Sequence, residues 1–221
     1  MYEWDFGVIL QHKWVFVQGA LISLKITLTV VLLGTVAGGL LGLARASRSR
    51  WLSIPAAAFV ELFLALPILV LLIWIYYCGP IIFGVNLSGF WTAVLALSLT
   101  LSAFVAEIVR SSLHAVPVWH VEAARGLGMT KIQALRYIVL PQAFRVMLPP
   151  LVSMYIDTLK MSSLASIIAV YELLDSAQNL IMSSYRPLEI YTVVALIYVA
   201  IIIPFALFTR RYESTMRWRL L

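Results

Sequence analysis

The chain has 221 residues, of which 62% are hydrophobic and 12% are charged, whereas soluble domains carry about 25% charged residues. This composition excludes an ordinary soluble domain, because a core of this size cannot bury so much apolar surface, whereas a lipid bilayer is itself apolar. The net charge of +6 does not indicate a nucleic-acid-binding protein, because the basic residues lie in short segments between long apolar runs, where they typically set membrane orientation.

The N-terminus does not have the pattern of a cleavable signal peptide. Its first basic residue is Lys13, and Glu3 and Asp5 precede it, so the basic n-region is missing. The single cysteine, Cys78, excludes a disulfide within the chain. No repeat or linker divides the sequence, and we expect one domain over residues 1–221.

Five apolar stretches are long enough to cross the hydrocarbon core of a bilayer as helices. Proline interrupts the second stretch at Pro67 and the fifth at Pro204, which a packed membrane bundle tolerates. The predicted fold is therefore an all-α integral membrane protein with five transmembrane helices. The predicted spans are residues 19–44, 54–77, 89–109, 147–170 and 190–209.

The first stretch carries a face of small residues. Gly34, Gly38 and Gly42 recur every fourth position, and such a face lets another helix approach closely. The pattern has two interpretations, an interface between subunits and packing within the chain.

The charges of the connecting segments predict the orientation. Most of the 16 basic residues lie in the first loop, in the loop between the third and fourth spans, and in the C-terminal tail. The positive-inside rule places these segments in the cytoplasm and the N-terminus outside, as an odd number of spans also requires. The outer side carries Lys13, Glu172, Asp175, Arg186 and Glu189.

The long cytoplasmic loop, residues 111–145, has helical patterns of its own. A helix over 114–126 has Pro117 near its start, Gly128 interrupts the pattern, and a second helix over 131–140 ends at Pro141. We predict two short helices broken by a glycine, a rigid knob suited to a groove on a cytoplasmic partner.

This loop also carries a specific resemblance. Glu122-Ala123-Ala124 is followed after three residues by Gly128, and after nine more by Ile138-Val139-Leu140-Pro141. The pattern resembles the EAA loop of permease subunits of ATP-binding-cassette (ABC) importers. The flanking runs 107–110, 140–145 and 160–164 are similar to permeases for polar amino acids of the histidine, glutamine and arginine type.

The resemblance implies a type I ABC importer permease whose coupling helix inserts into an ATPase subunit. An alternative interpretation is a surface helix that caps its own bundle. The residues that the resemblance assigns to coupling are Glu122, Ala123, Ala124, Arg125, Gly126 and Gly128.

The resemblance also implies partners. We expect an extracytoplasmic solute-binding protein, a second permease subunit, identical or similar, and cytoplasmic ABC ATPase subunits that hold ATP and magnesium, all at a bacterial inner membrane. The chain itself lacks a Walker A motif, because none of its lysines follows a glycine. His114 and His120 are six residues apart and do not share a helix face. We therefore expect no cofactor or metal on this chain and no enzymatic activity of its own.

Ionisable side chains within or at the ends of spans are candidates for the substrate path. Each costs about 2.5–3.5 kcal/mol at a helix centre, so each is expected to face protein or water. Asp157 and Lys160 are three residues apart on one helix face. They either line a path for a zwitterionic amino acid or form a structural ion pair that locks the fourth helix. The candidate path residues are Glu61, Glu107, Asp157, Lys160, Ser162 and Ser163.

Two positions depart from the family pattern. The family commonly has an acidic residue where this chain has Met161, and an arginine where it has Leu64. Both lie where a substrate would pass, which implies a substrate less cationic than arginine or a sister permease that holds the main binding groups.

Two other classes of function compete with the importer subunit. An ATP-independent secondary transporter usually has inverted repeats and more spans, and no such symmetry is visible. An intramembrane enzyme needs a nucleophile with a nearby base, yet all three histidines lie outside the predicted spans and no Gly-x-Ser-x-Gly motif is present.

Overall fold

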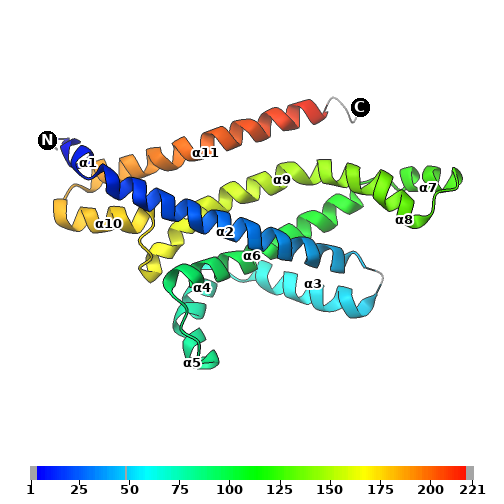
Figure 1. Cartoon of the computed structure of the whole chain (residues 1–221), viewed down its shortest axis with the longest axis horizontal. Helices are drawn as coiled ribbons and strands as arrows, with labels where there is room; N and C mark the ends of the chain where they lie inside the picture. Colours follow the sequence, from blue (N-terminus) through cyan, green and yellow to red (C-terminus); the bar gives the residue numbers. More distant parts are fainter. Residues whose placement is uncertain (1–3, 48, 218–221) are drawn as a thin grey trace.

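The computed structural model describes residues 4–47 and 49–217, and these residues are helical with short connections and contain no strand. The helices form an elongated bundle, with most of them aligned along one axis (Figure 1). The first half contains α1 (Gly7–Gln11), α2 (Lys13–Arg45), α3 (Arg50–Ala65), α4 (Ile68–Tyr77), α5 (Gly79–Phe83) and α6 (Gly89–His114). The second half contains α7 (Val118–Gly126), α8 (Lys131–Ala134), the π-helical η1 (Leu135–Val139), α9 (Leu140–Met161), the 3₁₀ helix η2 (Ser162–Ile168), α10 (Leu173–Ser184) and α11 (Pro187–Arg217).

The core lies where α2 meets α6. A Cβ atom added at Gly38 would lie 2.6 Å from the carbonyl oxygen of Ser102 and 2.6 Å from Cβ of Val105. Gly34 and Gly42 approach α6 in the same way, whereas a Cβ at the neighbouring Gly39 would meet open space. The small-residue face predicted from the sequence is thus buried within the chain, in the contact of two spans that run in the same direction.

The second predicted span, 54–77, is not one straight helix. Its two parts, α3 and α4, are bent by 100° relative to each other. Leu66 and Pro67 between them are extended, because proline cannot donate a backbone hydrogen bond and disfavours a helical residue before it. By length and apolar composition the described residues contain four spanning helices, or five if this bent pair counts as one.

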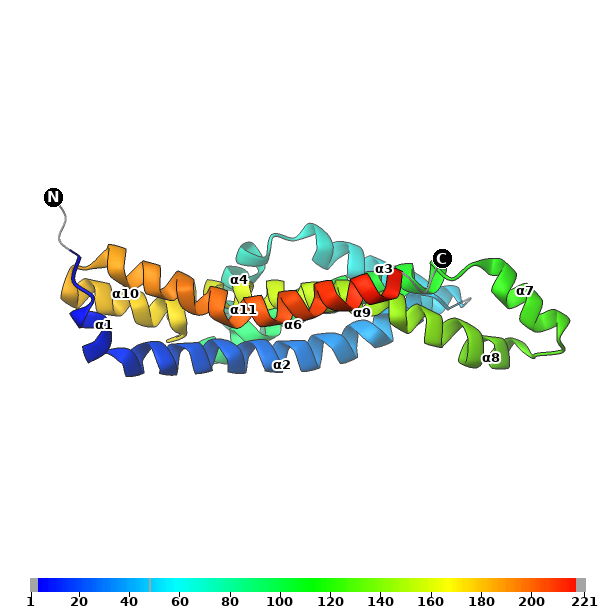
Figure 2. The ribbon, with the colours of Figure 1, turned by 90° about the horizontal axis from the view of Figure 1, so that it is seen from above.

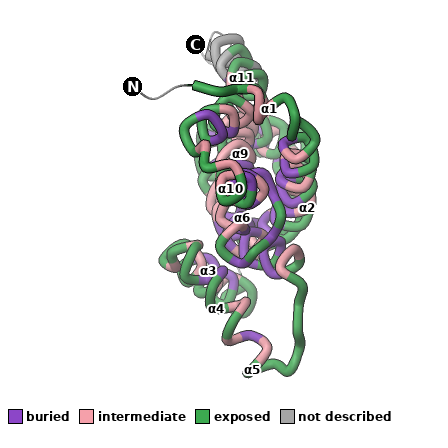
Figure 3. Tube along the Cα trace, turned by 90° about the vertical axis from the view of Figure 1, so that its left-hand side faces the viewer, coloured by how far each residue is buried: buried purple, intermediate pink, exposed green. Residues whose placement is uncertain are grey.

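The arm formed by α3, α4 and α5 extends to one side of the bundle (Figure 3). In α4, Leu71 and Leu72 are buried in the main core. In α3, Ala56 and Val60 are buried, and Phe59 and Phe63 pack with Val60 against α6. Both α3 and α4 therefore hold the arm to the bundle.

The fourth span begins earlier than the predicted boundary at residue 147. The helical path is continuous from residue 131 to residue 168, so the second loop helix runs directly into the membrane span. The prediction that Pro141 ends this helix is wrong. The π-helical turn η1 precedes it, and Pro141 then occupies the first turn of α9, where a missing backbone N–H costs little.

The charge pattern predicts that the segment between the fourth and fifth spans lies on the outer side. In the structure this segment forms the helix α10. Glu172 caps its N-terminus, and its carboxylate accepts the backbone N–H groups of Leu174 at 2.8 Å and Asp175 at 3.0 Å. The same carboxylate accepts the hydroxyls of Ser23 at 3.0 Å and Tyr198 at 3.3 Å, so one fully buried residue joins α10 to α2 and α11. Burial raises the pKa of the Glu172 carboxyl and outweighs the opposing effect of these hydrogen bonds.

Candidate functional site

The loop between α6 and α9 projects from one end of the bundle, opposite the end that carries α1 and α10 (Figure 2). Its first helix, α7, ends in a Schellman motif. The N–H of Met129 bonds to the carbonyl of Ala124 at 3.1 Å, and the N–H of Gly128 bonds to the carbonyl of Arg125 at 3.0 Å. Gly128 has a φ of +83°, a left-handed conformation that glycine adopts without strain. The predicted break in the loop is therefore a defined turn.

The next helix begins with an equally defined cap. The Thr130 hydroxyl accepts the N–H of Gln133 at 3.3 Å, and the Gln133 side-chain oxygen accepts the N–H of Thr130 at 2.8 Å. This reciprocal capping box fixes the direction in which the chain leaves the turn at Gly128. Only Met129 separates Gly128, at the turn that ends α7, from Thr130, which caps α8. Hydrogen bonds therefore fix the chain on both sides of the loop tip, which makes the tip rigid.

The EAA residues divide between the two faces of α7. Ala124 is 4% exposed and packs inward, whereas Glu122, Ala123, Arg125 and Gly126 are exposed. The protruding surface also carries exposed basic residues and large apolar side chains, which is typical of a surface that binds another protein. These large side chains are Val118, Trp119, Leu127 and Ile132.

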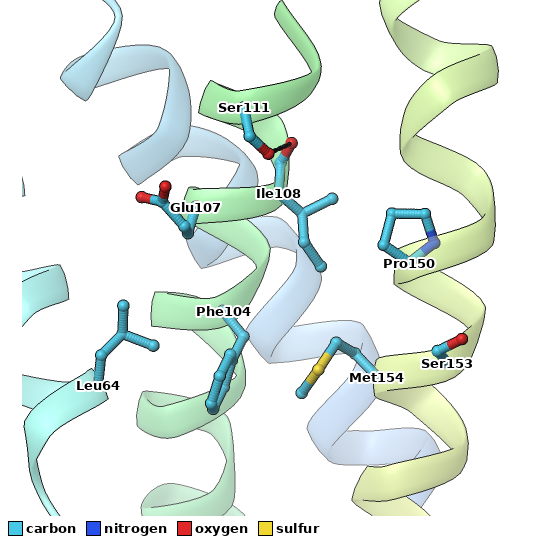
Figure 4. A pocket seen from close by; sticks show the side chains of 8 residues that line it. All are labelled: Leu64, Phe104, Glu107, Ile108, Ser111, Pro150, Ser153 and Met154. Atoms are coloured by element: carbon cyan, nitrogen blue, oxygen red, sulfur yellow. Dashed lines mark hydrogen bonds between the residues drawn. The ribbon is translucent and has the colours of Figure 1, made fainter. Parts of the chain in front are cut away.

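A cavity of about 450 Å³ lies between α3, α6 and α9 (Figure 4). Leu64 reaches it from α3, and its polar groups include Glu107 and Ser153. Its full lining is Leu64, Phe104, Glu107, Ile108, Ser111, Pro150, Ser153 and Met154.

Glu107 belongs to an ion cluster beside this cavity. Its carboxylate accepts Arg45 Nη1 at 2.6 Å and Arg110 Nη2 at 2.5 Å, and Arg110 Nε donates to it at 3.1 Å. Arg45 also lies 4.0 Å from Glu61 of α3. The cluster therefore joins α2, α3 and α6 at one end of the bundle.

Two further predicted path residues, Asp157 and Lys160, lie further along α9. Lys160 and Asp157 form the expected ion pair at 2.9 Å, with side chains 56% and 44% exposed. Pro150, Ser153, Asp157 and Lys160 recur at three- and four-residue spacing, so they share one face of α9. The cavity wall and the ion pair are therefore parts of one stripe.

The two serines of the predicted path behave differently from the ion pair. Ser162 is fully buried and donates its hydroxyl to the carbonyl of Leu159 at 2.8 Å, so it does not face an open path in this conformation. Ser163 donates to the carbonyl of Lys160 at 2.8 Å. The structure thus divides the predicted path residues into three groups. Glu61 and Glu107 both contact Arg45, and Asp157 pairs with Lys160. The two serines donate to backbone carbonyls of the preceding turn.

Sequence reasoning missed Arg45 as a site residue. The charge pattern places Arg45 among the first-loop cations that set orientation, but its side chain is only 12% exposed. No pattern along the chain signals this, because its partners Glu61 and Glu107 come from other helices. Among the residues that the structure describes, no group of three or more His, Cys, Asp or Glu side chains is suited to a metal ion.

Comparison with known proteins identifies the family. Residues 21–218 match the family described as the inner membrane component of binding-protein-dependent transport systems. The chain belongs to this family. The permease resemblance carried by Glu122-Ala123-Ala124 and Gly128 is thereby confirmed, and the ATP-independent secondary transporter and the intramembrane enzyme are set aside.

Individual relatives of this permease agree. It is 32% identical to the glutamine transport system permease protein GlnP of Escherichia coli (strain K12), over 97% of this chain and 99% of that protein. It is 37% identical to YckA, a probable amino-acid ABC transporter permease protein of Bacillus subtilis (strain 168), over 84% of this chain and 81% of that protein.

Solved structures support the fold of the permease. A chain from the crystal structure of an amino acid ABC transporter with histidines superimposes with a TM-score of 0.91 and 33% identity, covering 97% of this chain and 100% of that one. A chain of the MetNI methionine ABC transporter superimposes with a TM-score of 0.72 at 22% identity, over 91% of this chain and 96% of that one, a likeness of fold alone. The type I importer architecture expected from the resemblance is confirmed.

Proposed function

We propose that this permease, as one domain, imports a polar amino acid in an assembly with a second permease subunit, cytoplasmic ABC ATPases and an extracytoplasmic binding protein. The observation that carries the proposal is the rigid turn at Gly128, which presents exposed Glu122, Ala123 and Arg125 at the tip of a projecting loop. A stiff lever of this kind transmits the closing of an ATPase to the spans, because α7 follows α6 closely and α8 continues into α9. The ATP and its magnesium belong to the ATPase.

The exposed ion pair on α9 supports a shared path. Asp157 and Lys160 are half exposed on a span of this chain, and a charged pair facing lipid would be costly. A second permease subunit placed against this face gives the pair a protein or aqueous surrounding. The stripe that runs to Ser153 then leads from the ion pair to the cavity beside Glu107.

The cargo is proposed from the relatives and from the path. Relatives at 32% and 37% identity are named for glutamine and amino-acid transport. A zwitterionic cargo matches a path that offers both Asp157 and Lys160. Leu64 lines the cavity with an apolar side chain, at a position where the family commonly has arginine. The cavity therefore lacks that positive charge, which favours a cargo that needs no cation besides Lys160.

The orientation follows from the loop. The turn at Gly128 is cytoplasmic because it must meet an ATPase, which places the N-terminus and α10 outside and the C-terminus in the cytoplasm. Basic residues on the projecting loop, including Arg125, Lys131 and Arg136, agree with the positive-inside rule.

A glycine substitution tests the coupling role. Gly128→Ala forces a side chain into the left-handed region at a cost of about 1–2 kcal/mol, which distorts the turn between α7 and α8. We expect uptake of the labelled amino acid by vesicles carrying the whole transporter to fall at least several-fold, with expression retained.

The chain offers a matched control for this test. Gly84 also has a positive φ, +66°, and open space around it, but it ends α5 far from the loop. Gly84→Ala carries the same backbone strain and should leave uptake close to that of the wild type. Equal uptake by both variants would contradict the coupling role of Gly128.

A further inference from the structure

Thr100, near the middle of α6, carries a buried hydroxyl that has no hydrogen-bond partner in the described part of the chain. A threonine in a helix can donate its hydroxyl to a carbonyl of the preceding turn, as Thr158 of α9 does to Met154 at 2.8 Å. Thr100 makes no such bond, although the residue is only 6% exposed. A buried hydroxyl without a partner lowers stability, so its presence points to another state in which the hydroxyl is paired.

Thr100 lies on the face of α6 that lines the cavity. The lining residue of α6 farthest from the projecting loop is Phe104 (Figure 4). Thr100 precedes Phe104 by four residues, so it continues this face of α6 by one helical turn. The unpaired hydroxyl is therefore carried one turn beyond the cavity.

Asp157 has the corresponding position on α9. The helices α6 and α9 pack against each other, and Met154 is the lining residue of α9 farthest from the projecting loop. Asp157 follows Met154 by three residues and shares its helix face. Thr100 and Asp157 thus both lie one turn beyond the cavity, on two of the helices that line it.

Contacts with α2 place the unpaired hydroxyl and the ion pair of α9 at the same height in the bundle. A Cβ atom added at Gly34 of α2 would touch the side chain of Leu101. The neighbouring Thr35 shares a hydrogen bond of 2.9 Å with the hydroxyl of Tyr155. This part of α6 therefore lies at the height of Tyr155, and Asp157 is only two residues, about 3 Å, further along α9.

A second unpaired hydroxyl of α6, that of Ser98, lies on a different face. Ser98 precedes Val105 by seven residues, and Val105 is the side chain that a Cβ atom at Gly38 of α2 would meet. Ser98 therefore faces the close contact of α2 with α6. Of the two unpaired hydroxyls, only that of Thr100 is on the cavity face.

We propose that Thr100 is a further cargo-binding residue: its hydroxyl donates a hydrogen bond to the carboxylate of the transported amino acid, whose ammonium group binds Asp157. The inference rests on the proposed function, because it names one contact of the proposed cargo. An ionised carboxylate is a strong acceptor in a site of low polarity. Phe104 and Met154 stand between the cavity and this height, so the cargo reaches Thr100 after these two side chains turn aside.

The test measures equilibrium binding of labelled amino acids to the assembled transporter, purified without its binding protein. The probes are glutamine, histidine and arginine, and the one that binds most tightly is used with the variants. Thr100→Val keeps the shape of the side chain but removes the hydroxyl, whereas Thr100→Ser retains it. We expect Thr100→Val to raise Kd about tenfold and Thr100→Ser to stay within about twofold of the wild type, because a hydrogen bond to a charged group contributes strongly to binding.

Thermal stability separates a cargo contact from a structural role. Because the hydroxyl is unpaired in the empty protein, replacing it with a methyl group removes no bond. Without cargo, the Tm of Thr100→Val should therefore equal or exceed that of the wild type, although its affinity falls. Ser98→Ala removes the other unpaired hydroxyl of α6 and is the matched control, which should bind cargo as the wild type does.

Three results would overturn the role of Thr100 alone: wild-type affinity in Thr100→Val, an equal loss of affinity in Ser98→Ala, or a lower Tm of empty Thr100→Val. The first shows that the hydroxyl does not meet cargo, and the other two show a general effect on α6. A wild-type transporter that binds none of the probes would overturn the proposed function and this inference with it.

Discussion

Gly38 shows how a residue without a side chain can determine the arrangement of two spans. Its position brings the α2 backbone within contact of the Ser102 carbonyl oxygen, which cannot move aside as a flexible side chain would. Part of this was predictable, because the four-residue spacing of Gly34, Gly38 and Gly42 indicates close approach of a helix. The identity of that helix was not, since the spacing fits a partner in another subunit equally well.

Substitution of these glycines should separate packing from helix propensity. Gly38→Ala places a Cβ within 2.6 Å of backbone and side-chain atoms of α6 and forces the helices apart, at a cost of about 1–3 kcal/mol. Gly39→Ala meets open space and should be neutral or slightly stabilising. Thermal unfolding in detergent should therefore show a lower Tm for Gly38→Ala only; a loss of equal size in both variants would refute the assignment of this contact.

At the scale of elements, the sequence predicts helices better than it predicts their breaks and junctions. Pro67 and Pro141 have similar local signals, yet one lies at a 100° bend and the other lies within a continuous path. The difference arises because η1 widens the helix just before Pro141, which no periodicity reveals. The charge pattern assigns Glu172 to the outer side and does not predict α10, although an acidic residue before an apolar run is also an N-cap signal.

The junction at Glu172 gives a pH-dependent prediction. Burial raises the pKa of this carboxyl above its value in the unfolded chain. The stability that the group contributes is therefore fully present at low pH and is lost as the pH rises through the raised pKa. Glu172→Gln cannot ionise but keeps an oxygen for the N–H groups of Leu174 and Asp175.

We expect wild type and Glu172→Gln to have similar thermal stability near pH 4, with the variant becoming the more stable of the two as the pH is raised to 8. The pKa of Asp175 is also raised by burial, but this group is present in both proteins and largely cancels in the comparison. Glu172→Ala removes the cap and should cost about 1 kcal/mol or more at every pH. If the wild type instead becomes more stable relative to Glu172→Gln as the pH rises, the fold prefers the ionised carboxylate and the prediction is wrong.

At the scale of the whole molecule, the loop with α7 and α8 and the helices α1 and α10 lie at opposite ends of the bundle (Figure 2). We propose that the first end binds an ATPase and that the second faces outward. The sequence predicted the spans approximately, the helical loop between α6 and α9 and the family, because these depend on local composition and on one motif. It did not predict the cavity or the cluster at Arg45, because both are assembled from helices far apart in the chain.

The sharpest test is cross-linking from the loop tip and from α5 at the end of the side arm (Figure 3). Leu127 at the loop tip is 83% exposed and Ile81 on α5 is 84% exposed, so single cysteines at these positions are equally accessible. In a Cys78→Ser chain within the complete transporter, a short thiol-reactive cross-linker should join Leu127→Cys to the ATPase subunit and leave Ile81→Cys unjoined. An ATPase adduct at Ile81→Cys, with none at Leu127→Cys, would contradict the docking of the ATPase at the loop tip.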